Sequence, residues 1–350
     1  MAPRPEGSPR LSHRLEAVLL AVVAAVAGLL PERLAQGMGS ALGWLAGSVL
    51  RIRRGVVEEN LRRAFPDRDP RWIRRTASAH YRHLAREAIS LLLLPRRDRD
   101  ELLERTRVTG LEALEEACRE AGGALLLTGH LGNWEMGGAA VAIRGVPLDV
   151  VARRQSNPLF DDRLNRTRRR LGMEVLFREE ATRPLLKGLR SGRAAALVAD
   201  QNQREGGIFV DFFGVPASTT RGPAVMARRT GVPVFVAICL REPGARARYH
   251  LDIRPLPLPD VGTGEGTAGE SAGVGAGPDR KADEEAFDAA FLRRYMAALE
   301  EAIRLDPPQY FWGHRRWKTR PPGEGGEPGP VPGDASPHRG PDTGGSGTTK

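Results

Sequence analysis

The sequence predicts an α/β fold in which a mixed central sheet is flanked by helices, with a membrane-anchoring helix at the N-terminus. From Ala124 onward, short apolar runs alternate with helical stretches, which is typical of a sheet covered by helices. Near the N-terminus, residues 17–30 form an unbroken apolar run. A chain of 350 residues is long enough to bury a sizeable core, and we expect one large domain with appendages.

The elements of the sheet domain follow from the spacing of apolar residues. Strands are predicted at the short apolar runs of residues 124–128, 148–152, 174–177, 194–199, 234–240 and 249–253. Helices are predicted at residues 70–94, 158–171, 184–191, 222–230 and 284–305. Residues 1–14 are predicted to be flexible, and Gly and Pro dominate an insertion at 259–281 and a tail at 321–350, for which we predict disorder.

The N-terminal apolar run is flanked by arginines, with Arg10 and Arg14 before it and Arg33 after it. At about 1.5 Å per residue it covers roughly 21 Å, which is short of the ~30 Å hydrocarbon core unless residues 11–16 contribute. A softer apolar segment at residues 34–50 suits an interfacial or packed helix. A signal peptide and a buried helix are the alternatives, but the two segments together favour a membrane anchor over residues 15–54.

Composition limits the partners and the kinds of site. A net charge of +10, mainly from arginine, fits nucleic acid, anionic lipid headgroups or acidic carrier proteins equally well. Two cysteines, Cys118 and Cys239, are too few for a disulfide framework or a cysteine-based zinc site.

The candidate chemistry lies in residues 125–135, where an apolar strand is followed by Gly129, His130, Gly132 and Glu135. On one regular helix, a spacing of five would place the histidine and the glutamate about 140° apart. A strand-loop-helix arrangement brings them together, with His130 in the turn and Glu135 on the first helical turn. A carboxylate on one ring nitrogen would fix the tautomer of a general base. A helix-capping histidine with an unrelated glutamate explains the spacing equally well.

Five blocks in order resemble the lipid A late-acyltransferase family. Residues 130–135, His-Leu-Gly-Asn-Trp-Glu, look like its H-x4-D/E block. Residues 60–66 are similar to its N-L-x-x-A-F-P segment, and residues 151–158 to its arginine-bearing block. Residues 200–217 are similar to its third block, and residues 309–317 to its closing Q-Y-x-W-x-H-R-R signature. The resemblance runs from about Leu15 to Lys318, with the sheet domain at residues 55–320.

This resemblance implies a glycerolipid-acyltransferase-like fold and an enzyme on the inner (plasma) membrane, with its catalytic domain facing the cytoplasm. It implies transfer of an acyl chain from acyl carrier protein or a coenzyme A thioester to a glycolipid hydroxyl, such as that of a lipid A precursor. No cofactor, metal or nucleic acid is implied. His130 would deprotonate the hydroxyl, and Glu135 would stabilise the resulting imidazolium. Backbone N–H groups of residues 129–133, or the Asn133 side chain, are candidates for the oxyanion.

The remaining candidate residues follow predicted strands. Arg153 and Arg154 end the second strand and would clamp a substrate phosphate. Asp200 and Gln201 end another strand at what should be the same edge, and we expect them to order the site. Weaker phosphate candidates are Arg204 and Arg221.

Two other functions remain open from the residues alone. The chain is then either a basic membrane- or nucleic-acid-binding protein without catalysis, with a structural His130, or a hydrolase in which the same base activates water. The first alternative predicts a steep dependence of binding on salt, and the second predicts product without an acceptor lipid.

Overall fold

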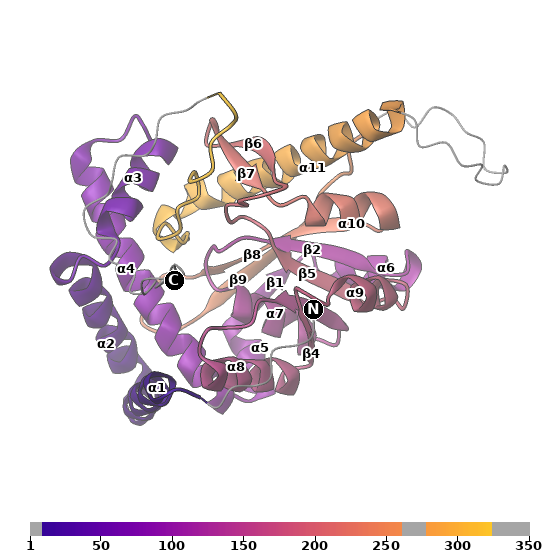
Figure 1. The fold of residues 1–350 in the computed structure, drawn as a ribbon. Helices are drawn as coiled ribbons and strands as arrows, with labels where there is room; N and C mark the ends of the chain where they lie inside the picture. Colours follow the sequence, from indigo (N-terminus) through magenta and orange to yellow (C-terminus); the bar gives the residue numbers. More distant parts are fainter. Residues whose placement is uncertain (1–8, 261–277, 324–350) are drawn as a thin grey trace, which may run out of the picture.

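A computed structural model describes residues 9–260 and 278–323 (Figure 1). Most of the predicted flexible N-terminus (1–14), glycine-rich insertion (259–281) and disordered tail (321–350) lies outside the described residues. At two places the described residues show a helix inside a segment that was predicted to be flexible or disordered, so the predicted N-terminus and insertion each extend a few residues too far. The first helix begins at Leu11 and the last long helix begins at Pro278.

Seven strands form the central sheet in the order β1-β9-β8-β2-β5-β3-β4. Their pairings are parallel except for β8 with β9, so the predicted mixed sheet is confirmed. The strands are β1 Thr106–Thr109, β2 Ala124–Thr128, β3 Leu148–Ala152, β4 Met173–Phe177, β5 Ala194–Val198, β8 Val234–Arg241 and β9 Tyr249–Pro255. A separate hairpin of β6 Ile208–Phe212 and β7 Val215–Thr219 follows β5.

Helices cover both faces of the sheet because strand side chains alternate between them. In β2, Leu125 and Leu127 join the core under α9, α10 and α11, whereas Ala124 and Leu126 join the core under α5, α6 and α7. Figure 1 shows α11 running across its face of the sheet. The helices are α5 Arg99–Arg105, α6 Leu111–Glu120, α7 Trp134–Ala142, α8 Pro158–Arg170, α9 Thr182–Leu189, α10 Gly222–Thr230 and α11 Pro278–Leu305.

Four helices precede the sheet: α1 Leu11–Leu29, α2 Glu32–Trp44, α3 Arg54–Ala64 and α4 Pro70–Leu93. A π-helical turn, Leu45–Val49, extends α2, and short 3-10 turns lie at Leu94–Arg96 and Pro307–Gln309. By length and composition, α1 is apolar enough to cross a membrane. Its side chains are largely exposed, with Leu29 86% exposed, so the protein itself does not bury this apolar surface.

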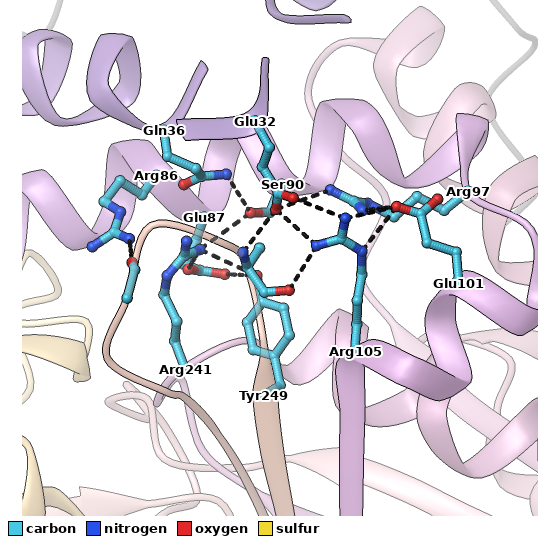
Figure 2. A network of polar contacts seen from close by, with 12 residues as sticks. Glu32, Gln36, Arg86, Glu87, Ser90, Arg97, Glu101, Arg105, Arg241 and Tyr249 are labelled. Carbon is cyan, nitrogen blue, oxygen red and sulfur yellow. Dashed lines mark hydrogen bonds and ion pairs between the residues drawn. The ribbon is translucent and has the colours of Figure 1, made fainter. Parts of the chain in front are cut away.

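The helix α2 is held against the body of the protein by close packing and by ion pairs. A Cβ at Gly43 would lie 2.2 Å from the carbonyl oxygen of Tyr81 on α4, so only glycine allows this approach. Glu32, at the start of α2, accepts two hydrogen bonds from Arg105 at 2.7 and 2.8 Å (Figure 2). Gly39, Gly43 and Gly47 therefore serve packing against α4, whereas a Cβ at Gly37 would meet open space.

Candidate active site

His130 lies in the turn between β2 and α7, as the strand-loop-helix interpretation predicted. Gly132 has a φ of +63°, and a Cβ there would lie 2.0 Å from the carbonyl oxygen of Cys239. Both the positive φ and the close approach to the Cys239 backbone therefore require glycine at this position. Asn133 caps α7, since its side-chain oxygen accepts a 2.9 Å hydrogen bond from the backbone N–H of Met136. The sequence thus folds into a tight turn that presents His130 at the carboxyl edge of the sheet.

Asp200 is the carboxylate that contacts His130. Its Oδ1 lies 2.6 Å from Nδ1 of the imidazole, and its Oδ2 accepts a 2.9 Å hydrogen bond from the backbone N–H of His130. Strand register explains the pairing, because Thr128 on β2 lies opposite Val198 on β5. His130 and Asp200 are each two residues beyond that pair, so adjacent parallel strands deliver both to one place.

The two groups of this pair shift each other's pKa in opposite directions. Burial alone would lower the pKa of His130, but the charge and hydrogen bond of Asp200 outweigh burial and raise it. Burial alone would raise the pKa of the Asp200 carboxyl, but His130 lowers it, with help from the nearby Arg316 guanidinium. When the carboxylate accepts a hydrogen bond from the Nδ1–H group, the proton of the neutral ring is on Nδ1 and the lone pair is on Nε2.

With Nδ1 turned toward Asp200, His130 lines a cavity of about 1210 Å³ together with Gln201. The side-chain nitrogen of Gln201 lies 3.1 Å from Nε2 and is the protein group at that edge of the ring. Trp134 packs edge-on against the imidazole, with ring centroids 4.9 Å apart. The ring is therefore held on three sides, and its basic nitrogen remains accessible to a ligand in the cavity.

The predicted contact between His130 and Glu135 is wrong. Glu135 projects from the first turn of α7 toward α8, where Arg168 binds both carboxylate oxygens, Nε donating to Oε2 at 2.9 Å. Both partners are nearly buried, with side chains 11% and 10% exposed. The glutamate still lines the cavity, but its charge is compensated by arginine. Spacing along the chain correctly placed it on the helix and did not reveal this partner.

The cavity lining combines apolar and cationic side chains. Its apolar members include Leu126, Val150, Leu164, Met173, Cys239 and Leu251, together with Gly137 and Gly138 of α7. Four arginines also line it, and these are Arg153, Arg168, Arg178 and Arg204. This combination fits a ligand with a long apolar portion and an anionic portion.

The structure separates the predicted arginines into two groups. Arg153 and Arg204 line the cavity with Gln201. Arg154 is not among its lining residues, since its guanidinium carbon lies 3.7 Å from the centroid of the Phe177 ring. Arg221 forms a 2.8 Å ion pair with Asp288 on α11 and is likewise absent from the lining. Neither of these two arginines is placed to contact a ligand there.

Three of the five predicted backbone donors of the turn have acceptors within the protein. The N–H of His130 bonds to Asp200, that of Gly132 to the carbonyl of Gln309 at 3.0 Å, and that of Asn133 to the carbonyl of Cys239 at 2.9 Å. The Asn133 side-chain amide donates to Glu87 at 2.6 Å, and the residue does not line the cavity. The Asn133 side chain thus has a partner away from the cavity, and its role in substrate binding stays a prediction. Gln201 is an uncharged donor beside Nε2.

The C-terminal segment, residues 309–317, packs against the turn that carries His130. The N–H of Phe311 bonds to the carbonyl of His130 at 2.8 Å. Arg316 is 1% exposed and donates to the carbonyl of Ser218 at 2.7 Å. His314 lines the cavity, and burial lowers its pKa to about 4, so it is neutral at pH 7. Residues of the closing signature thus dock this segment beside the His130–Asp200 pair.

Two arginines of the cavity were not predicted from the sequence. Arg168 lies among other arginines at the basic end of α8, so no local pattern distinguished it. Arg178 directly follows β4, and the strand-end position that indicated Arg153 could have indicated it as well. Among residues 9–260 and 278–323, no group of three or more His, Cys, Asp or Glu side chains is placed to hold a metal ion.

Comparison with known proteins agrees with this arrangement. The bacterial lipid A biosynthesis acyltransferase family matches residues 4–319. The phosphatidylinositol mannoside acyltransferase of Mycolicibacterium smegmatis is 32% identical over 223 residues, covering 61% of this chain and 71% of that protein. The lipid A biosynthesis palmitoleoyltransferase of Escherichia coli is 25% identical over 289 residues, covering 82% and 86%. The lauroyltransferase of the same organism is 24% identical over 296 residues, covering 84% and 88%.

The family match covers nearly the whole chain, including both strand ends that carry His130 and Asp200. The relatives differ in the lipid that their names give, but all are acyltransferases. This chain therefore belongs to the bacterial lipid A biosynthesis acyltransferase family and is an enzyme that transfers acyl groups.

Proposed function

We propose that this enzyme moves a fatty acyl chain from a thioester, of acyl carrier protein or coenzyme A, onto a hydroxyl of a membrane glycolipid. The observation that carries the proposal is the orientation of His130. Its Nδ1 is bound by Asp200 at 2.6 Å, and the residue lines a cavity with apolar and cationic side chains. An oriented, partly buried imidazole of this kind is the usual general base of acyl transfer.

In the proposed reaction, Nε2 of His130 takes the proton of the acceptor hydroxyl as its oxygen attacks the thioester carbonyl. Asp200 keeps the Nδ1 proton in place and stabilises the imidazolium that forms. Collapse of the tetrahedral intermediate breaks the C–S bond, and the proton passes from Nε2 to the departing thiolate. The imidazole is then neutral again, and the step uses no cofactor or metal.

Gln201 is the proposed donor to the oxyanion. Its amide nitrogen lies 3.1 Å from Nε2, so the incoming hydroxyl takes its place at the imidazole and leaves the amide free for the developing charge. A single preorganised donor of this kind contributes about 10²–10³ in rate. We propose that Glu135 and Arg168 act as one neutral unit that shapes the wall of the cavity next to the base.

The apolar and cationic side chains of the cavity suit the two parts of the substrates. We assign the acyl chain to the apolar lining residues on the sheet strands and α8, beside Gly137 and Gly138 of α7. A phosphate of the acceptor or of the donor's pantetheine arm is assigned to Arg153, with Arg178 and Arg204 nearby. Planar guanidinium groups bind phosphate through paired hydrogen bonds.

The proposed location is the inner membrane, with the sheet domain on the cytoplasmic side. Support comes from the exposed apolar surface of α1 and from the need to meet a lipid acceptor and a cytoplasmic thioester at one site. Lipid A and mannosylated phosphoinositide are named for relatives; for this chain we propose the wider class of glycolipid hydroxyls.

The test incubates the purified full-length enzyme with acyl carrier protein and coenzyme A thioesters and a membrane lipid extract, and identifies products by mass spectrometry. The proposal predicts an acylated glycolipid that requires both substrates and disappears with His130→Ala. Free fatty acid at the same rate with or without acceptor would show a hydrolase instead. No thioester consumption with any donor would contradict the proposed reaction.

A further inference from the structure

A second cavity, of about 790 Å³, lies between α2, α4 and the end of β8. It shares no lining residue with the cavity at His130. Its wall carries the guanidinium groups of Arg82, Arg86 and Arg241 and the imidazole of His83. The proposed acyl transfer makes no use of these four side chains.

Arg241 is the buried centre of this wall, with its side chain only 3% exposed. Its Nη1 donates to Glu87 at 2.8 Å, as Figure 2 shows, but its Nε and Nη2 have no hydrogen-bond partner among the described residues. Buried guanidinium N–H groups are rarely left without an acceptor, because they lose their hydrogen bonds to water and gain no replacement. Two unpartnered donors on one buried arginine indicate an acceptor that binds from the cavity.

Two neighbours on α4 share this feature. Nε2 of His83 and Nε of Arg86 are also buried without a partner among the described residues. Burial lowers the pKa of His83, so its ring is neutral at pH 7 and offers an N–H donor in one tautomer. The unpartnered groups are therefore all nitrogens, and a ligand rich in acceptor oxygens would satisfy them together.

The charges around the cavity favour an anion with about one net charge. Its lining includes two carboxylates beside the three guanidinium groups. Glu242 forms a 3.3 Å ion pair with Arg107, outside the cavity, and Asp306 accepts a 2.7 Å hydrogen bond from Gln309. Arg241 shares its charge with Glu87. Arg82, which is exposed, and Arg86 thus supply the positive charge that remains for a ligand.

We propose that this cavity binds the phosphodiester headgroup of an anionic phospholipid, at a site separate from the acyl-transfer site. Lipid is favoured over free phosphate because Trp44 lines the cavity and is 47% exposed. The residues that follow it continue an apolar exposed surface, with Leu45 40% and Val49 54% exposed. Tryptophan is enriched at the headgroup level of membranes, so a phosphate held by Arg82 and Arg241 leaves its acyl chains along this surface.

Binding is tested with the full-length enzyme in neutral detergent micelles, by calorimetric titration with dihexanoyl phosphatidylglycerol, dihexanoyl phosphatidylcholine and inorganic phosphate. Arg82→Ala removes an exposed cationic group of the cavity, and Ala41→Trp fills its mouth without changing charge. Arg75→Ala is the matched control, an exposed arginine of the same helix that does not line the cavity.

The proposal predicts that phosphatidylglycerol binds and that Arg82→Ala weakens its binding about tenfold through the loss of one charge-assisted contact. Ala41→Trp should weaken binding at least as much by blocking the cavity, while Arg75→Ala should stay within about twofold. Equal affinity for phosphatidylcholine, or equal loss in all three variants, would overturn the site. Inorganic phosphate that binds as tightly as phosphatidylglycerol would overturn its assignment to lipid. These outcomes do not depend on acyl transfer, which is measured separately.

Discussion

Two buried carboxylates lie near the turn that carries His130, and they have different partners. Asp200 follows β5 and binds the His130 imidazole and backbone, while Glu135 opens α7 and binds the Arg168 guanidinium. The first carboxylate therefore acts on a group that titrates near neutral pH, and the second on a permanently charged arginine.

The difference shows that strand order, rather than spacing along the chain, determines which carboxylate contacts His130. His130 and Glu135 are five residues apart, yet the helix turns the glutamate toward α8. His130 and Asp200 are seventy residues apart, yet β2 and β5 are neighbours in register. The base belongs to the sheet edge, and the glutamate belongs to the wall of the cavity.

The largest expected effect is that of His130→Ala, which removes the base itself. Turnover should fall by about 10²–10⁴, as for the loss of a positioned general base. The measurement is the steady-state rate of acyl transfer by a preparation with the same thermal unfolding midpoint as the wild type. Near-wild-type turnover in such a preparation would contradict the assignment of the base.

A smaller loss is expected for Glu135→Ala, because it leaves the nearly buried Arg168 without its partner. Loss of one member of a buried ion pair costs about 3–5 kcal/mol of stability, so the unfolding midpoint should drop together with activity. The double variant Glu135→Ala/Arg168→Leu should recover part of that stability. An unchanged midpoint for Glu135→Ala would show that the pair does not support the cavity wall.

Much of the fold could be predicted from local patterns. The six predicted strands are present because each is a short apolar run. The sequence did not indicate β1, whose four residues Thr106–Thr109 carry only one large apolar side chain, nor the hairpin β6–β7 outside the main sheet. Helices α3, α5 and α6 were also missed.

The site was predicted in part. Local sequence placed His130 in a turn and Glu135 on a helix, and strand ends indicated Asp200, Gln201 and Arg153. The Asp200 contact depends on the order of β2 and β5 in the sheet, and the Glu135 contact depends on the packing of α8. Neither is encoded in a contiguous motif.

Arg153 and Arg154 extend the comparison to two adjacent residues of one kind. Arg153 lines the cavity, whereas Arg154 stacks on Phe177. Arg153→Lys should impair turnover by about tenfold despite keeping the charge, because lysine cannot reproduce the paired hydrogen bonds of a guanidinium. The loss should appear mainly in KM if the contact is the same in the ground and transition states.

Arg154→Lys is the matched control for this prediction and should leave both kinetic constants near the wild-type values. If Arg153→Lys and Arg153→Ala both behave like the wild type, the acceptor's phosphate is not bound by Arg153, and Arg204 or Arg178 becomes the next candidate.

The smallest effect on chemistry is expected from removal of residues 1–30, which changes neither carboxylate. Part of the truncated protein should leave the membrane fraction. The rest should stay bound to the membrane through α2 and the arginines at residues 51–54. Turnover of a water-soluble acceptor should change by less than about threefold, since α1 lines neither cavity. Flotation of membranes measures the first effect, and complete solubility of the full-length protein without detergent would contradict an anchor.

The most direct test of the central claim, that Asp200 rather than Glu135 tunes His130, is the pH dependence of kcat/KM in Asp200→Asn and Glu135→Gln. The wild-type rate should fall on the acid side as His130 is protonated, with an apparent pKa above the ordinary histidine value because Asp200 raises the pKa of His130. Asp200→Asn removes that charge, leaves burial to lower the pKa, and should move the acid limb to lower pH. Glu135→Gln should leave the limb in place. A limb that moves with Glu135→Gln and stays fixed with Asp200→Asn would contradict the account.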